Sequence, residues 1–194
     1  VATVSQLRDY VTDVSFRFKD NPFHCLDHGS QVCMTMRKML SRMVTNASAD
    51  PSENLASDLH DRTFGISSDP LAQFAVVFAA LIHDIDHQGV PNSQLVRENS
   101  PLASKYKNQS ISEQHSIDLA WNHLMGPEFK DLRACIYSDV SDLNRFRQLV
   151  VNSVLATDFI DDQLVSLRKE RRERAFVTGR RDSSSENMNR KAGL

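Results

Sequence analysis

One ten-residue segment carries the clearest chemical pattern in the chain: residues 83–92 read HDIDHQGVPN. The apolar run FAVVFAALI precedes it without a helix breaker, so we expect the helix to continue through the histidines. His83 and His87 would then lie one turn apart on the same face, with Asp84 beside them. Two imidazoles and a carboxylate in this arrangement suit a divalent metal that keeps open positions for water.

A second segment, NPFHCLDHGSQV, repeats the four-residue spacing at His24 and His28. Histidines and carboxylates together suit Zn²⁺ at a nitrogen-rich position and Mg²⁺ or Mn²⁺ at an oxygen-rich one. Two adjacent ions can lower the pKa of a bridging water and hold a phosphoryl oxygen. The peptidase motif H-E-x-x-H also pairs histidines, but position 84 is Asp and the glutamate base is absent. The pattern therefore predicts a metal-dependent hydrolase other than a peptidase.

The elements that must position these residues are expected to be helices. Glycine is scarce and apolar residues recur at intervals of three and four, which predicts an all-α chain. Residues 45–70 are rich in Ser, Asn and Asp and predict a long polar surface loop, and Asp69-Pro70 is typical of a helix cap and first turn. Helices are expected over 4–18, 26–44, from Pro70 through the metal motif, over part of 92–107, from Ser112 and from Ser141.

Length, charge and cysteine content exclude several classes of protein. A chain of 194 residues suits one domain or most of one. A net charge of -2 gives no electrostatic case for nucleic acid as a partner. The three cysteines are scattered, without a C-x-x-C pair, which predicts a reducing, cytoplasmic setting. The longest apolar stretch falls short of the ~20 residues that a membrane span needs, so we expect no membrane contact from this segment.

The order of the motifs resembles the catalytic domain of class I 3′,5′-cyclic nucleotide phosphodiesterases, members of the HD superfamily. The family pattern H-N-x-x-H resembles residues 24–28, and H-D-x-D-H-x-G-x-x-N matches residues 83–92 at every fixed position. Downstream, YKNQSISEQH at 106–115 and VLATD at 154–158 resemble two further family segments. The resemblance covers about residues 7–177 and implies the N-terminal portion of a compact multi-helix HD-type phosphodiesterase domain.

The resemblance also implies roles for individual residues. His24 would be the general acid that protonates the leaving 3′ oxygen. The first of two divalent metals would bind His28, His83 and Asp84, with Asp84 bridging to the second. His87 and Glu113 would hold metal-bound waters and orient His24. The implied reaction is attack of a metal-bound hydroxide on the phosphorus of cAMP or cGMP, giving the 5′-nucleotide in signal transduction. Supporting polar residues near the site would be Asp86, Asn92, His115, Thr157 and Asp158.

The chain departs from the family pattern in three places. Cys25 stands where the family has Asn, and Gly29 stands where it has Ala; both positions are close to the acid. The family's last metal ligand and its purine-binding glutamine lie further along, and nothing in 178–194 matches either. We therefore expect a partial catalytic domain over 1–177 and a polar, disordered tail over 178–194. Regulatory domains and dimerisation would belong to the parent protein.

Two other interpretations stay open. The chain could be another HD-family phosphohydrolase, or a non-catalytic metal-binding helical module that keeps its ligands as a clamp on the fold. The last interpretation predicts bound metal without turnover. Two further histidines are set apart from the centre: His60 in the polar loop is expected to be solvated, and His123 fits an amphipathic helix as well as it fits a site.

Overall fold

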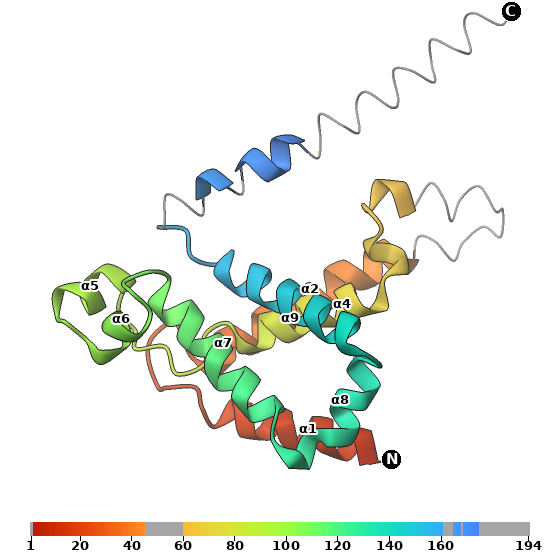
Figure 1. Ribbon diagram of the computed structural model, residues 1–194, viewed down its shortest axis with the longest axis horizontal. Coiled ribbons are helices and arrows are strands. Elements are labelled where there is room, and N and C mark those ends of the chain that lie inside the picture. The colour runs from red at the N-terminus through yellow and green to blue at the C-terminus, as the bar shows by residue number, and fades with distance from the viewer. Residues whose placement is uncertain (1, 46–59, 161–164, 168, 175–194) are drawn as a thin grey trace, which may run out of the picture. The chain divides into compact units, whose positions relative to one another are not determined.

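Every described element of the computed structural model is helical (Figure 1). The structure describes residues 2–45, 60–160, 165–167 and 169–174, and none of these lies in a strand. The all-α prediction is therefore confirmed over this part of the chain. The elements are α1 (Ala2–Ser15), α2 (Leu26–Thr45), η1 (Ile66–Ser68), α4 (Pro70–Ile82), α5 (Asn92–Arg97), α6 (Pro101–Lys105), α7 (Ile111–Leu124), η2 (Pro127–Phe129), α8 (Lys130–Ile136) and α9 (Val140–Leu155).

The chain divides into two units, Val1–Thr157 and Asp158–Leu194. The described residues of the second unit include helical stretches at 165–167 and 169–174. The predicted disordered tail, the boundary expected at 177 and most of the predicted polar loop lie outside the described residues. All six residues assigned to the predicted centre belong to the first unit.

Helix α4 is the central helix of the first unit. It is apolar around most of its circumference, as the run FAVVFAALI indicates, and a helix of this kind belongs in a core. It packs against α2 and α9, and its Phe78 ring lies 5.5 Å from that of Phe146. The predicted cap is confirmed, because the Asp69 side chain accepts a hydrogen bond from Ala72 N and Pro70 is the first helical residue.

Helix α1 joins the same core through Tyr10, which is 0 % exposed. The Tyr10 hydroxyl donates to the Ala120 carbonyl at 3.0 Å, and burial raises its pKa. The Tyr10 ring stacks on His123, whose Nε2 lies 3.0 Å from Asp13 Oδ2. His123 is therefore a packing residue between α7 and α1. Helix α1 ends at Ser15, about one turn before the predicted end, and residues 16–25 connect it to α2.

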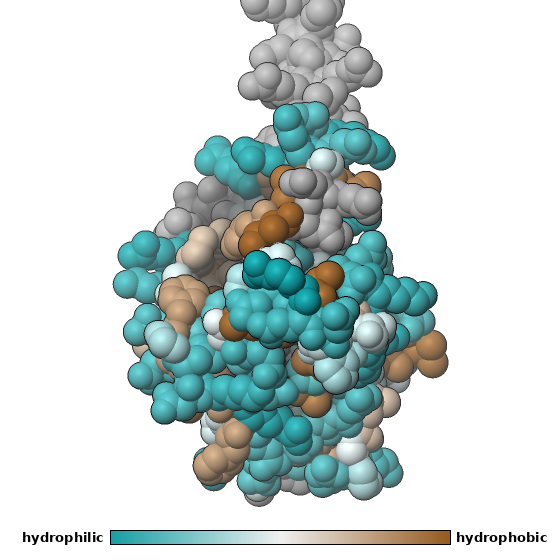
Figure 2. All heavy atoms as spheres, turned by 90° about the vertical axis from the view of Figure 1, so that its left-hand side faces the viewer, coloured by the Kyte–Doolittle hydropathy of each residue, from teal (hydrophilic) through white to brown (hydrophobic). Residues whose placement is uncertain are grey.

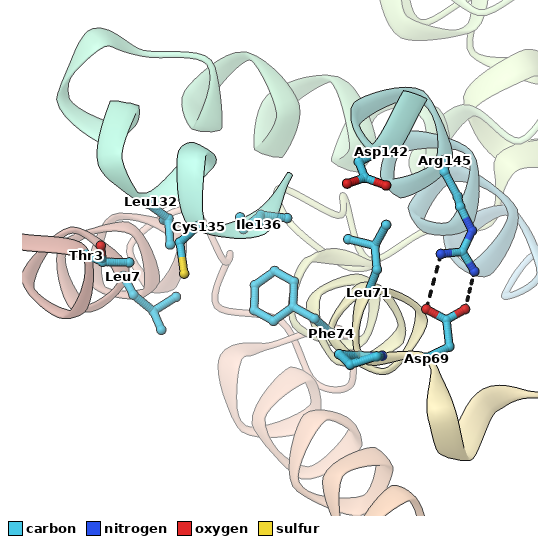
Figure 3. Close-up of a pocket in the computed structure, with 11 residues that line it drawn as sticks. Thr3, Leu7, Asp69, Leu71, Phe74, Leu132, Cys135, Ile136, Asp142 and Arg145 are labelled. Carbon is cyan, nitrogen blue, oxygen red and sulfur yellow. Dashed lines mark hydrogen bonds and ion pairs between the residues drawn. The ribbon is translucent and has the colours of Figure 1, made fainter. Parts of the chain in front are cut away.

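Helix α8 is a short element that the sequence pattern did not predict. It packs on α1 and buries Leu132. Helices α1, α4, α8 and α9 together line a largely apolar cavity of about 580 Å³ (Figure 3). Leu7 and Phe74 contribute to its apolar wall, and the ion pair between Asp69 and Arg145 lies at one end.

Hydrophilic side chains predominate on the face seen from the α5–α6 side, with scattered apolar ones (Figure 2). Beneath α5 and α6 a second, smaller core forms around Leu95, Ala103, Tyr106 and Ile111. Among the described helices, none has both the length and the hydropathy to cross a membrane.

Candidate metal centre

The histidine motif at 83–87 lies in a turn, and the expectation of a continuing helix is wrong. Helix α4 ends at Ile82, His83 is its C-cap, and residues 83–86 form a turn that His87 directly follows; we call residues 83–87 together the 83–87 turn. Asp86 takes a left-handed backbone conformation with φ of +56°, which an α-helix does not tolerate. Its N–H donates to the carbonyl of Arg17 at 3.0 Å, so the distant segment replaces the next helical hydrogen bond. His83 and His87 therefore do not share a helix face.

The upstream pair, His24 and His28, does not lie on one helix either. Helix α2 begins at Leu26, so His28 lies in its first turn and His24 precedes it. Both side chains nevertheless reach the 83–87 turn. The His24 ring stacks on His87 with centroids 3.6 Å apart, and the His28 ring lies 5.4 Å from that of His83. Tertiary packing thus brings the two predicted pairs into one cluster.

The centre of this cluster is the carboxylate of Asp84, a residue that is 5 % exposed. Three imidazole nitrogens converge on its Oδ2 atom. His24 Nδ1 lies at 2.9 Å, His83 Nε2 at 3.2 Å and His28 Nε2 at 3.6 Å. A buried carboxylate needs positive charge nearby. A cation shared by this oxygen and the three ring nitrogens would supply that charge.

Burial and charge act against each other on these groups. Burial disfavours the charged form of Asp84, but the hydrogen bonds and charges of His83 and His24 outweigh it and lower the pKa of Asp84 to about 2. Burial likewise opposes protonation of His83, yet the hydrogen bond to Asp84 and its negative charge raise the pKa of His83. The carboxylate therefore attracts positive charge onto its neighbours, and a divalent cation can take the place of those protons.

The donor atoms fit a metal ion. His83 Nδ1 lies 2.9 Å from the carbonyl of Ala80, to which it donates its proton, so Nε2 faces Asp84 and is the nitrogen that would give up its proton to bind a metal. Metal-binding histidines are commonly held by such a carbonyl contact. The ligand atoms of His28, His83 and Asp84 all lie within 4.8 Å of one another. Two nitrogens and one oxygen form a three-ligand set of the kind that leaves a position for water.

A second group of ligand atoms with the same spread comprises His24, Asp84 and His87. The ring of His87 is held differently, because its Nδ1 accepts a hydrogen bond from Gly89 N at 3.0 Å. The neutral ring therefore carries its proton on Nε2 and is a donor there. Burial, reinforced by the charge of His24, lowers the pKa of His87 to about 4, which keeps it neutral at pH 7. This favours a hydrogen-bonding role for His87.

Glu113 approaches the centre from the first turn of α7. Its Oε2 accepts a hydrogen bond from Asn92 Nδ2 at 2.9 Å, and Asn92 Oδ1 accepts from Ser112 N at 3.0 Å. The negative charge of Glu113 favours the protonated form of His83. On the next turn, His115 Nε2 lies 2.8 Å from Asp86 Oδ2. The predicted positions of Glu113, Asn92, Asp86 and His115 thus fall around the 83–87 turn.

Other predicted residues lie elsewhere. His60 is exposed, with Nδ1 2.5 Å from Ser68 Oγ, and it is not part of the cluster. Residues 60–62 and 66–68 are helical, so the described end of the segment predicted as a loop is not a loop throughout. The Thr157 hydroxyl donates to the carbonyl of Val154, and Thr157 lines a small cavity of about 130 Å³ with His83. Asp158 belongs to the second unit, where its Oδ1 accepts from Ile160 N.

Sequence patterns did not identify three residues of the 16–25 segment that contact the site. Phe23 is 60 % exposed, and its ring lies 4.3 Å from His28 and 5.0 Å from His24. Asn21 Nδ2 donates to the carbonyl of His87 at 3.2 Å. Lys19 Nζ lies 3.0 Å from Asp86 Oδ1. No motif marks these three residues. The one sequence feature that could have indicated their role is that they lie within five residues of His24.

Comparison with known proteins identifies related enzymes. A family model described as 3′5′-cyclic nucleotide phosphodiesterase matches residues 23–190. A probable 3′,5′-cyclic-AMP phosphodiesterase of Caenorhabditis elegans is 28% identical over 157 residues, and a human dual specificity calcium/calmodulin-dependent 3′,5′-cyclic nucleotide phosphodiesterase is 28% identical over 146. These matches cover 79% and 75% of this chain but 20% and 18% of the relatives. The chain thus spans about a fifth of their length.

A solved structure supports the same relationship. The phosphodiesterase domain of the RhoPDE fusion protein from the choanoflagellate Salpingoeca rosetta matches with a TM-score of 0.61 at 26% sequence identity. The match covers 79% of this chain and 41% of that chain.

Proposed function

Since this chain belongs to the 3′5′-cyclic nucleotide phosphodiesterase family, we propose that it supplies the metal-binding part of a site that hydrolyses cAMP or cGMP to the 5′-nucleotide in signal transduction. The observation that carries the proposal is the convergence of His24, His28 and His83 on one oxygen of the buried Asp84. These side chains come from separate segments, so the arrangement is a product of the tertiary fold and not of local spacing alone.

In this proposal His28, His83 and Asp84 would hold the first of two divalent cations, and Asp84 would also contribute to holding the second. Imidazole nitrogens favour Zn²⁺ in the first position, and oxygen-rich coordination favours Mg²⁺ or Mn²⁺ in the second. Bound cations would supply positive charge opposite the phosphate oxygens and lower the pKa of a bound water.

His24 is the proposed general acid. Its Nδ1 is engaged by Asp84, so the opposite nitrogen, Nε2, is the atom that would donate a proton to the leaving 3′ oxygen. The ring is held between its hydrogen bond to Asp84 and its stacking contact with His87. Both contacts restrict rotation of the ring, and an acid acts only when its proton is directed at the leaving group.

His87 and Glu113 are the proposed supporting residues. Neutral His87 presents an Nε2–H donor, which suits a phosphate or water oxygen. Glu113 adds a negative charge that increases the attraction of the centre for cations, and Asn92 holds its carboxylate. Orientation of His24 and of bound water is the role we propose for the pair.

Turnover of cAMP and cGMP with Mg²⁺ and with Mn²⁺ tests the proposal, in this chain and in the full-length natural protein, whatever its length. Two substitutions separate the roles. Asp84→Asn should abolish both zinc binding and turnover, because Asp84 belongs to both ligand groups. His24→Ala should keep the zinc content and lower turnover by ~10²–10⁴, the usual effect of losing a general acid.

His60→Asn is the matched control, because His60 is exposed and contacts Ser68 and not the centre. It should retain full zinc content and turnover. Zinc content equal in the Asp84→Asn and His60→Asn proteins would refute the ligand assignment. Zinc binding without turnover in the full-length protein would instead favour a non-catalytic module.

The proposed partner is a small-molecule cyclic nucleotide. We also propose a cytoplasmic location, supported by the free thiols of Cys25, Cys33 and Cys135, which fit a reducing compartment.

A further inference from the structure

The segment that carries His24 has little regular structure of its own. Residues 16–25 connect α1 to α2, and residues 19–21 belong to no helix or turn. Within its second half, Cys25 N donates to the carbonyl of Phe23, and this hydrogen bond joins only residues of the segment itself. The position of the His24 ring must therefore depend on contacts that this segment makes with other parts of the chain.

Such contacts join residues 17–21 to residues 86–88, and we call these two segments together the loop contact. One is a backbone hydrogen bond from Asp86 N to the carbonyl of Arg17 at 3.0 Å. Another runs from Asn21 Nδ2 to the carbonyl of His87 at 3.2 Å. The first fixes the backbone of the segment, and the second fixes the Asn21 side chain, to the turn that carries the proposed metal ligands.

Lys19 makes the remaining two polar contacts, and both engage side chains of residues 86–88. Its ammonium lies 3.0 Å from Asp86 Oδ1 and donates to Gln88 Oε1 at 2.7 Å. Lys19 thus spans the loop contact five residues before His24. Among the described residues, no other lysine forms an ion pair with the 83–92 segment.

Asp86 is itself anchored from the opposite side. Its Oδ2 lies 2.8 Å from His115 Nε2 on α7, and its backbone has a φ of +56°. Since one oxygen faces α7 and the other faces Lys19, the carboxylate transmits the position of α7 to the His24 segment. A flexible lysine needs such an anchored partner to define a position.

Exposure limits what Lys19 can do for the fold as a whole. The side chains of Lys19 and Asp86 are 44% and 31% exposed, and ion pairs at this exposure contribute little to global stability. A purely structural role therefore predicts a small effect on melting and none on the geometry of the centre. A positioning role predicts a local change around His24 without a large change in melting.

We propose that Lys19 is a positioning residue for the acid, which holds the His24 segment against the 83–87 turn through Asp86 and Gln88. The inference rests on the proposed function for the role of His24. The location of the ring, however, can be measured without turnover.

The test uses proton NMR of the histidine rings in the metal-free chain. Stacking at 3.6 Å places His24 within the ring-current field of His87, which shifts its signals. Comparison with His24→Gln and His87→Gln assigns the two rings. Lys19→Met keeps the unbranched side chain and removes the ammonium, and we expect the ring-current shift of the His24 signals to decrease as the stack on His87 loosens. Lys19→Arg restores a cation and should retain most of the shift.

Lys38→Met is the matched control, since Lys38 is exposed on α2 and its loss changes the net charge equally. It should leave the His24 signals unchanged, and Tm should change little in the three lysine variants. Unchanged His24 signals in Lys19→Met would overturn the inference. So would an equal loss in Lys38→Met, or a loss that comes only with unfolding.

Turnover provides a second, independent readout in the full-length protein. Lys19→Met should lower kcat by up to ~10²-fold through misplacement of the acid, with KM within about twofold. A wild-type protein without turnover would contradict the proposed function. The ring signals would still decide whether Lys19 positions His24.

Discussion

A missing methyl group at position 29 explains one departure from the family pattern. A Cβ on Gly29 would lie 2.9 Å from Cζ of Phe18, closer than carbon atoms approach. The Phe18 ring is half-buried and packs against the main core. Gly29 therefore allows the segment that carries His24 to lie directly on the first turn of α2. Ala at this position would require Phe18 to move.

The effect of Gly29→Ala on the free energy of unfolding should therefore change sign with the residue at position 18. In the wild-type chain, overlap with Phe18 costs ~1–3 kcal/mol of unfolding free energy and offsets the ~1 kcal/mol gain in helix propensity. In a Phe18→Leu background the shorter side chain leaves room, so Gly29→Ala should stabilise the chain by about 1 kcal/mol. Urea denaturation of the four proteins measures the coupling. Equal effects in both backgrounds would show that the two residues do not interact.

The individual site residues differ in how well sequence alone could place them. His24, His28, His83, Asp84 and His87 stand in motifs whose spacing marks them as a group, and the structure brings them together. Lys19 and Asn21 have no such mark. Their function depends on partners more than sixty residues away, and no pattern in one sequence reports contacts at that separation.

The existence of the central helix could be predicted from the sequence, but its end could not. The run before His83 predicts a buried helix, and α4 is that helix. Its end could not be predicted, because the residues up to His87 are all compatible with a helix locally. The hydrogen bond from Asp86 to Arg17 and the contact of His83 with Ala80 decide the geometry instead. Helix α8 was missed because seven residues give too few periods to recognise.

The start of α4 allows a pH prediction. Asp69 caps the helix and pairs with Arg145 of α9, and the hydrogen bond from Arg145 is the main cause that lowers the pKa of Asp69 below 3.8. A depressed carboxyl pKa contributes stability that is present above the unfolded-state value and is lost as pH falls through the folded-state value. Asp69→Asn keeps a good cap and loses the charge. It should lower Tm at pH 7, and the difference should disappear toward pH 2.

Asp69→Ala distinguishes the contribution of the helix cap to stability from that of the ion pair with Arg145. It should be less stable than Asp69→Asn by ~1 kcal/mol at both pH values, because the bond to Ala72 N is lost. Thermal melts monitored by circular dichroism at pH 7 and near pH 2 measure both effects. A difference between Asp69→Asn and wild type that persists unchanged in acid would argue against a contribution of the charge pair.

At the scale of the whole molecule, the site depends on distant parts of the chain. The contact between His24 and Asp84 joins residues 60 apart, and the contacts of Asn21 and Lys19 join residues 66 and 69 apart. The described fold is helical as predicted, since its core helices are local in sequence. How these helices assemble into one cluster was known only from the resemblance to a family.

On the proposed function, three ligands gathered from two distant segments would make the cation a thermodynamic part of folding. An unfolded chain cannot present His28 together with His83 and Asp84, so an ion bound there adds RT ln(1 + [L]/Kd) to stability, or ~2.7 kcal/mol at one hundred times Kd. On the proposed function, Zn²⁺ should raise Tm of the wild type and leave Asp84→Asn unchanged, as melts with Zn²⁺ and with EDTA would show. An equal rise in both would place the ion elsewhere. For this chain a chelator would then lower the melting temperature, and the local supply of metal would set the margin by which the folded state outlasts heat or denaturant.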